Sequence, residues 1–180
     1  MSILMEIPGT ILKMTEYKIP VESFAYDLVQ LSEGYEDLMD GSLDYRHDGI
    51  LLTEDLCTET MIMEAKPDDR GADQDLGKLG LVLSNLILGM KNRYSPRIPP
   101  RNLRIHGIMF IGYRVKMIEV RLKDDRYPVA YFVSEVTIPR HSGDDSVRQL
   151  IQVLKMFIAY KKRVSRNVGH LRGAGNTPSH

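Results

Sequence analysis

Apolar residues recur at helical spacing in three stretches of the chain. The spacing predicts helices over residues 20–34, from about residue 73 or 75 to 91, and over residues 144–163. A proline begins the first stretch and a glycine ends it, as is typical of helix boundaries. In the third stretch the side that we expect to face the core carries Val147, Leu150, Ile151, Leu154, Phe157 and Ile158.

Other segments follow the pattern of β-strands. Residues 43–52 and 58–66 predict two strands that are separated by a polar turn and form a hairpin. Residues 103–113, 115–122 and 129–138 predict three more, the first apolar on both faces, as expected of a strand covered on both sides. The order helix, hairpin, helix, three strands, helix predicts an α/β fold with a mixed central sheet flanked by helices.

Length and composition favour one domain. A chain of 180 residues with 43% apolar residues can form one well-packed core, which we place at residues 1–163. Residues 164–180 lack apolar periodicity, so we expect a disordered basic tail. Cys57 is the only cysteine, which excludes an internal disulfide and favours an intracellular location. No segment reaches the ~20 consecutive apolar residues that a membrane span needs, so we expect no membrane contact.

The formal charge of zero hides a division along the chain. Residues 1–75 hold 5 Lys and Arg against 18 Asp and Glu, and residues 76–180 hold 19 against 6. Such a division suits a protein with an acidic, cation-binding half and a basic half that faces phosphates. An equally weighted alternative is that the halves attract each other within the fold or pair in a homodimer.

One group of residues indicates chemistry. In the strand 61–66, alternation places Glu64 and Lys66 on the same face. Asp48 lies sixteen residues before Glu64, and the midpoint between them, residue 56, is the centre of the predicted turn. The two acids should therefore face each other across the hairpin. Like charges so placed destabilise a sheet unless something compensates them, and a divalent cation would do so.

Asp48, the triplet Glu64-Ala65-Lys66, the hairpin between them and the helix after them resemble the PD-(D/E)XK nuclease superfamily. The resemblance covers about residues 20–138 and implies a restriction-endonuclease-like fold. It further implies that Asp48, Glu64 and the Ala65 carbonyl ligate Mg²⁺ or Mn²⁺, while Lys66 orients or helps to deprotonate the attacking water. Where this superfamily often has a proline before the first acid, the chain has His47.

Auxiliary positions follow from the same resemblance. Many members carry a glutamate on the first helix, for which Glu22 is the candidate, although a solvated acid in a first helical turn is also typical there. Gln74 and Lys78 lie opposite the leucines of the second helix, where they meet a phosphate or water. A loop over residues 92–102 and its borders lack acids, and we expect phosphate contacts from Lys91, Arg93, Arg97, Arg101 and Arg104.

These observations predict a Mg²⁺-dependent nuclease that hydrolyses DNA or RNA, with Asp48, Glu64 and Lys66 at its centre. The main alternative is a catalytically inactive module of the same fold that binds nucleic acid or a protein partner. A third is a structural subunit whose acidic half docks on a basic partner. The presence of all three catalytic residue types favours the enzyme.

Overall fold

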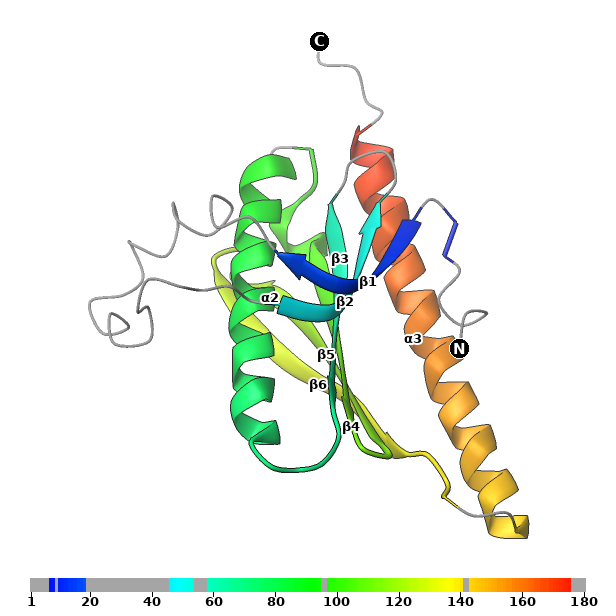
Figure 1. Ribbon diagram of the computed structural model, residues 1–180. Coiled ribbons are helices and arrows are strands. Elements are labelled where there is room, and N and C mark those ends of the chain that lie inside the picture. Colours follow the sequence, from blue (N-terminus) through cyan, green and yellow to red (C-terminus); the bar gives the residue numbers. More distant parts are fainter. Residues whose placement is uncertain are drawn as a thin grey trace.

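The computed structural model describes residues 7–8, 10–18, 46–53, 58–94, 97–140 and 143–175 (Figure 1). The predicted helix 20–34, which includes Glu22, lies outside these residues. The described elements are β1 (Thr10–Lys18), β2 (Arg46–Thr53), β3 (Glu59–Lys66), α2 (Ala72–Tyr94), the 3₁₀ helix η4 (Pro100–Asn102), β4 (Arg104–Ile111), β5 (Arg114–Lys123), β6 (Tyr127–Thr137) and α3 (Asp144–Gly175).

The strands form one sheet whose order follows the chain, β1-β2-β3-β4-β5-β6. Among these strands only β3 and β4 pair in parallel, with Met61 beside His106 and Lys66 beside Ile111. A parallel pair needs a long crossover, which α2 supplies, whereas short turns join the antiparallel pairs β4–β5 and β5–β6. The predicted α/β class with a mixed sheet and helices on both sides is confirmed.

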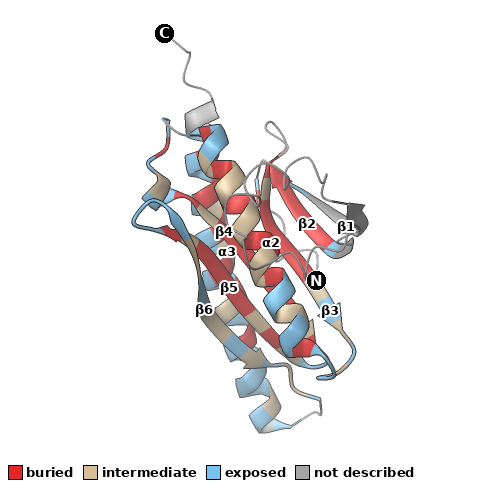
Figure 2. Ribbon diagram, turned by 90° about the vertical axis from the view of Figure 1, so that its left-hand side faces the viewer, coloured by how far each residue is buried: buried red, intermediate tan, exposed pale blue. Residues whose placement is uncertain are grey.

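Each face of the sheet has its own core. α2 covers one face, where Leu79, Leu83 and Ile87 pack against Ile62 and Ile105. α3 covers the other face, where Phe157 and Val164 pack against strand residues that include Met61, Ile108 and Met117. Figure 2 shows the buried residues on the central strands and along the inner sides of both helices. β4 is therefore buried on both faces, as its apolar sequence predicted.

The central strands carry two adaptations to this packing. A Cβ on Gly107 would lie 2.7 Å from the Leu83 Cδ1 atom, so only glycine lets α2 approach β4 this closely. On the opposite face, the buried Tyr160 hydroxyl donates to the carbonyl oxygens of Gly107, at 2.8 Å, and Ile118, at 2.9 Å. The register of β5 against β6 shifts between Met117 and Ile118. Tyr160 thus ties α3 to the sheet beside an irregular point in the ladder.

Two elements differ from the sequence prediction near the start and the middle of the chain. β1 was not predicted, although it pairs with β2 along most of its length. α2 continues to Tyr94 rather than ending near residue 91. The buried Tyr94 hydroxyl forms a hydrogen bond with the Thr58 hydroxyl, with 2.5 Å between the two oxygens. The predicted loop 92–102 therefore begins within a helix, and η4 forms its end.

The prediction of a disordered tail from residue 164 is wrong up to Gly175, because α3 continues to that residue. The helix lies against the sheet through a stripe of which the prediction selected only Phe157. The buried residues of this stripe are Val153, Phe157, Tyr160, Val164, Val168 and Leu171. Burial of its last three members holds the C-terminal turns in place. The described helices include none that is long and apolar enough to cross a membrane.

The same change of stripe leaves several predicted core residues in solvent. The first turns of α3 extend past the sheet (Figure 1). Of the side chains predicted to face inward, only Phe157 is buried; those that are exposed are Val147, Leu150, Ile151, Leu154 and Ile158. The predicted spacing was correct for a helix, but the rotation of the helix about its axis was not.

Candidate active site

The register of the β2–β3 hairpin brings the two predicted metal-binding acids together. Gly49 pairs with Met63 and Ile50 with Ile62, so the next positions in the same register are Asp48 and Glu64. The register shifts only on the other side, between Leu51 and Leu52. In addition, the Ala65 N–H donates to Asp48 Oδ2 at 2.6 Å. The carboxylate of Asp48 is thus fixed against the triplet that follows β3's buried centre.

These side chains lie on the face that α2 covers. Ile50 and Ile62 lie two residues from Asp48 and Glu64 on their strands, so they share a face with the two acids, and both belong to the core beneath α2. Asp48 is exposed, and Glu64 and Lys66 are half-buried. The strands therefore carry an apolar face up to this point and a charged, solvent-accessible end beyond it.

Lys66 completes the group together with an acid that the sequence did not single out. Its Nζ atom lies 2.9 Å from Asp75 Oδ2, near the start of α2. The pKa of Lys66 is raised, first by the hydrogen bond to Asp75 and then by the charges of Asp75, Glu64 and Asp48. The pKa of Asp75 is lowered, first by its hydrogen bond with Lys66. Lys66 therefore remains protonated at neutral pH beside three carboxylates.

The local backbone explains why Asp75 reaches Lys66. The turn after β3 ends at Gly71, whose φ of +70° lies in the left-handed region that favours glycine. The Asp75 N–H then donates to the Gly71 carbonyl at 3.0 Å, which begins α2 directly behind the strand end. The Gly112 N–H donates to the Lys66 carbonyl at 2.8 Å, so the β4–β5 turn holds the backbone of the site.

The donor set fits a small hard cation. Two carboxylates, from Asp48 and Glu64, occupy the positions that continue the β2–β3 register, and the Ala65 backbone holds Asp48 by a hydrogen bond. Within the described parts of the chain there is no group of three or more His, Cys, Asp or Glu side chains that could hold a metal ion. Mg²⁺ needs no such cage, because proteins commonly hold it through one or two carboxylates while water and substrate phosphates complete its octahedron.

The two auxiliary residues on α2 lie at the rim. Gln74 is exposed one residue before Asp75. Lys78 is also exposed, and its Nζ lies 3.5 Å from Asp75 Oδ1. Asp75 thus bridges Lys66 and Lys78, and of these two cations Lys66 interacts with the charges of Asp48 and Glu64.

The five predicted phosphate contacts do not adjoin this site. Lys91 and Arg93 lie in the last turn of α2, and Arg97 and Arg101 are exposed beyond it. From Asp75 to Arg93 the helix rises roughly 27 Å at about 1.5 Å per residue. Arg104 begins β4 on the opposite face, five residues before Met109, the partner of Glu64. Arg104 is thus separated from the acids by the sheet, and the phosphate contacts of all five residues stay a prediction.

No protein-family model, no curated protein and no solved structure matches this chain. The coarse class that the structure itself defines is an α/β protein with a six-strand mixed sheet between two helices. The chemistry of the site must therefore be argued from its residues.

Proposed function

We propose that the protein is a metal-dependent phosphodiesterase that hydrolyses DNA or RNA at the group formed by Asp48, Glu64, Lys66 and Asp75. The observation that carries the proposal is the register of the β2–β3 hairpin, because its pairs Gly49–Met63 and Ile50–Ile62 continue to Asp48 opposite Glu64. By alternation Lys66 lies on the same face as Glu64. Opposed acids at a strand end cost stability unless they serve to hold a cation. The resemblance of the triplet to PD-(D/E)XK nucleases supports the same conclusion.

Asp48 and Glu64 would hold Mg²⁺ or Mn²⁺, with the Ala65 carbonyl as a further oxygen ligand. Bound there, the ion would supply charge relief on the phosphate and a lowered pKa for bound water. Asp48 is fixed for this role by the 2.6 Å hydrogen bond that it accepts from Ala65. That bond uses one carboxylate oxygen, Oδ2, and leaves Oδ1 to serve as the ligand atom.

Lys66 would act as a positive charge rather than as a base. Its raised pKa keeps the ammonium protonated, so it donates hydrogen bonds to the attacking water or to a phosphate oxygen. This narrows the two roles that the family resemblance implies, orientation and deprotonation, to the first. Asp75 is a positioning residue in this scheme, because it touches Lys66 rather than the substrate.

The basic residues at the far end of α2 fit a long substrate. A nucleic-acid strand advances about 3.4 Å per residue, so the rise of α2 between Asp75 and Arg93 corresponds to roughly eight nucleotides. We therefore assign Lys91, Arg93, Arg97 and Arg101 to backbone phosphates away from the cleaved bond. Gln74 and Lys78, at the rim of the site, would contact phosphates next to it.

The test is cleavage of labelled single- and double-stranded DNA and RNA with Mg²⁺, Mn²⁺ or EDTA. Wild type should cleave at least one of these with metal and none with EDTA. Lys66→Met should lower turnover at least about 10²-fold, the scale of one positioned electrostatic group. The matched control, Lys123→Met, removes an exposed lysine from the last position of β5 and should cleave at the wild-type rate.

Calorimetric titration with Mn²⁺ separates the roles of the acids and the lysine. Asp48→Asn should weaken Mn²⁺ binding and abolish cleavage together, whereas Lys66→Met should bind Mn²⁺ as well as wild type or better. Asp145→Asn, in an exposed position on α3, is the control for the loss of one carboxylate. If the wild-type protein binds nucleic acid but neither binds Mn²⁺ nor cleaves, the proposal of an enzyme is wrong and the protein is an inactive binding module.

A further inference from the structure

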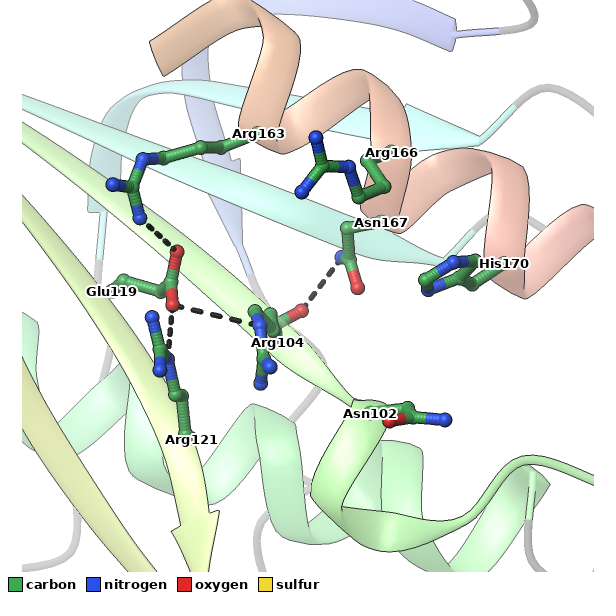
Figure 3. A pocket seen from close by; sticks show the side chains of 8 residues that line it. All are labelled: Asn102, Arg104, Glu119, Arg121, Arg163, Arg166, Asn167 and His170. Carbon is green, nitrogen blue, oxygen red and sulfur yellow. Dashed lines mark hydrogen bonds and ion pairs between the residues drawn. The ribbon is translucent and has the colours of Figure 1, made fainter. Parts of the chain in front are cut away.

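A second polar site lies on the other face of the sheet, where α3 crosses the first residues of β4 and the end of β5. It is a pocket of about 330 Å³ (Figure 3). The residues that line it are all polar or charged and come from η4, β4, β5 and the C-terminal half of α3: Asn102, Arg104, Glu119, Arg121, Arg163, Arg166, Asn167 and His170.

The charge of the pocket is strongly positive. Four arginines surround a single acid, Glu119, which is 1% exposed. Arg104 and Arg163 each approach a Glu119 carboxylate oxygen at 3.6 Å, and Arg121 forms a closer ion pair with the same side chain. Glu119 thus forms ion pairs with three guanidinium groups, but its single negative charge can neutralise only one of their three positive charges.

The remaining cations repel one another. The pKa of Arg104 is lowered, first by burial and then by the neighbouring charge of Arg121, with a further contribution from Arg163. Arg166, on α3 like Arg163, adds a fourth guanidinium group to the pocket. No acid among the described residues forms an ion pair with it. An anion in the pocket would relieve this repulsion.

The pocket also contains a hydrogen-bond acceptor without a donor. Asn167 is 3% exposed, and its amide nitrogen donates to the Arg104 carbonyl at 2.7 Å. Its Oδ1 atom has no hydrogen-bond partner among the described residues, and Figure 3 shows it on the side of Asn102 and His170. Buried polar atoms are rarely left unpaired. A ligand that carries a hydroxyl or N–H group beside its anion would satisfy this oxygen.

We propose that this pocket binds a phosphate monoester, as carried by a nucleotide or by the 5′ end of a nucleic-acid strand. Guanidinium groups match phosphate oxygens in paired hydrogen bonds, and a phosphate monoester carries about −1.5 to −2 at neutral pH. A singly charged carboxylate would compensate fewer of the four arginines. The volume is larger than phosphate alone needs and lies at the lower end of the ~300 to 1,000 Å³ usual for small-molecule sites, so the attached sugar also fits.

The site is independent of the proposed nuclease centre, which lies on the α2 face and at the other end of the parallel strands. Its test therefore uses the full chain in EDTA, where the metal site does not act. The probes are inorganic phosphate, a nucleoside 5′-monophosphate, and one short oligonucleotide with either a 5′-phosphate or a 5′-hydroxyl. Tighter binding of the phosphorylated oligonucleotide than of the nucleotide identifies a strand end, and equal binding identifies the nucleotide.

Arg166→Gln should weaken binding of the phosphorylated probe by about tenfold or more, the scale of a charge-assisted hydrogen bond. Arg166 is exposed and pairs with no acid among the residues that the structure describes, so the variant should keep the wild-type melting temperature. Arg148→Gln removes the same charge from an exposed position on the same helix but outside the pocket, and should bind like wild type. The proposal is overturned if no probe binds at millimolar concentration, if the 5′-phosphate gives no advantage, or if both variants weaken binding equally.

Discussion

The Lys66 ammonium and the Asp75 carboxylate meet at 2.9 Å, across the turn that joins β3 to α2. This ion pair links the strand that carries the proposed catalytic lysine to the helix behind it. Because the pair is partly exposed to solvent, it adds little to the stability of the fold. Its main effect is to orient the Lys66 side chain and to keep it charged.

Asp75→Asn should therefore lower turnover about tenfold while Mn²⁺ affinity stays unchanged. Asp75 is the first cause of the raised pKa of Lys66. Without it, Lys66 loses its proton at a lower pH, so the alkaline limb of the pH–rate profile should move to lower pH. Asp73→Asn, which changes an exposed acid in the same turn of α2, is the control. An unmoved alkaline limb in Asp75→Asn would contradict a role for Asp75 in holding Lys66.

Gly112→Ala should destabilise the fold by about 1 to 2 kcal/mol, the usual cost of a left-handed conformation in a residue with a Cβ atom. The φ of Gly112 is +55°, and an added Cβ would lie 3.2 Å from the Pro67 carbonyl oxygen. Gly89→Ala is the opposite control, because nothing lies within 4 Å of its added Cβ. It should stabilise α2 by about 0.5 to 1 kcal/mol. Urea unfolding measures the free energy of unfolding of both variants. Equal stability of Gly112→Ala and wild type would show that the β4–β5 turn accommodates the added Cβ atom.

His106 should make the fold sensitive to acid. The pKa of His106 is lowered to about 4, chiefly by burial. The charge of Glu119 raises this pKa, whereas the charges of Arg104, Arg163 and Arg121 lower it. Its ring also meets the edge of Tyr160, at 5.3 Å between centroids. Because the folded pKa lies below the unfolded value, this contribution to stability is complete above about pH 6.5 and is lost as the pH falls towards 4.

The loss from His106 alone amounts to about 3.5 kcal/mol at most, since each pKa unit corresponds to about 1.4 kcal/mol. His106→Phe keeps an aromatic ring beside Tyr160 and removes the titration. Urea unfolding at several pH values should show a smaller decline between pH 6.5 and 4 for this variant than for wild type. His170→Asn, which changes an exposed histidine, should decline like wild type. Parallel declines for His106→Phe and wild type would exclude His106 as the cause.

The end of α3 should contribute to the core despite its polar sequence. Leu171 is fully buried, so Leu171→Ala should cost about 2 to 5 kcal/mol. Leu150 is 47% exposed at the other end of the helix, so Leu150→Ala should cost about 0.5 kcal/mol or less. Denaturant unfolding of the two variants distinguishes this arrangement from the predicted one, in which Leu150 faced the core and residue 171 lay in a disordered tail.

The sequence was sufficient wherever the decisive relation is local. The spacing of Asp48 and Glu64 about a turn predicted that they would oppose each other, and the register of the neighbouring pairs agrees with it. Asp75 was missed because an aspartate near a helix start has an adequate explanation as a favourable charge at the helix N-terminus. Its distance to Lys66 depends on the geometry of the intervening turn, which the spacing does not contain.

The sequence was insufficient wherever the relation is long-range. Periodicity identified α3 but not which of two neighbouring stripes meets the sheet, because both stripes contain apolar residues. Similarly, Arg104 and Asn167 are 63 positions apart, yet the Asn167 amide donates to the Arg104 carbonyl. Arg104 was therefore grouped with its neighbours along the chain, although the fold joins it to arginines of β5 and α3.

The parallel pairing of β3 with β4 also has a consequence for how quickly the chain folds. The described strands form two antiparallel sets, β1 to β3 and β4 to β6, and the parallel pair that joins the sets links positions as distant as Met61 and His106. The pairs β2–β3, β4–β5 and β5–β6 link positions much closer in the chain, whereas β1 pairs with β2 across a comparable distance, as in Thr10 with Thr53. Closing such a loop costs entropy before the contacts it brings together repay it, so we expect the joining of the two sets to limit the folding rate. Ile62→Val and Ile108→Val, on the two strands of this pair, should then mainly slow refolding in stopped-flow measurements. Leu171→Ala, at the far end of α3, should instead mainly accelerate unfolding.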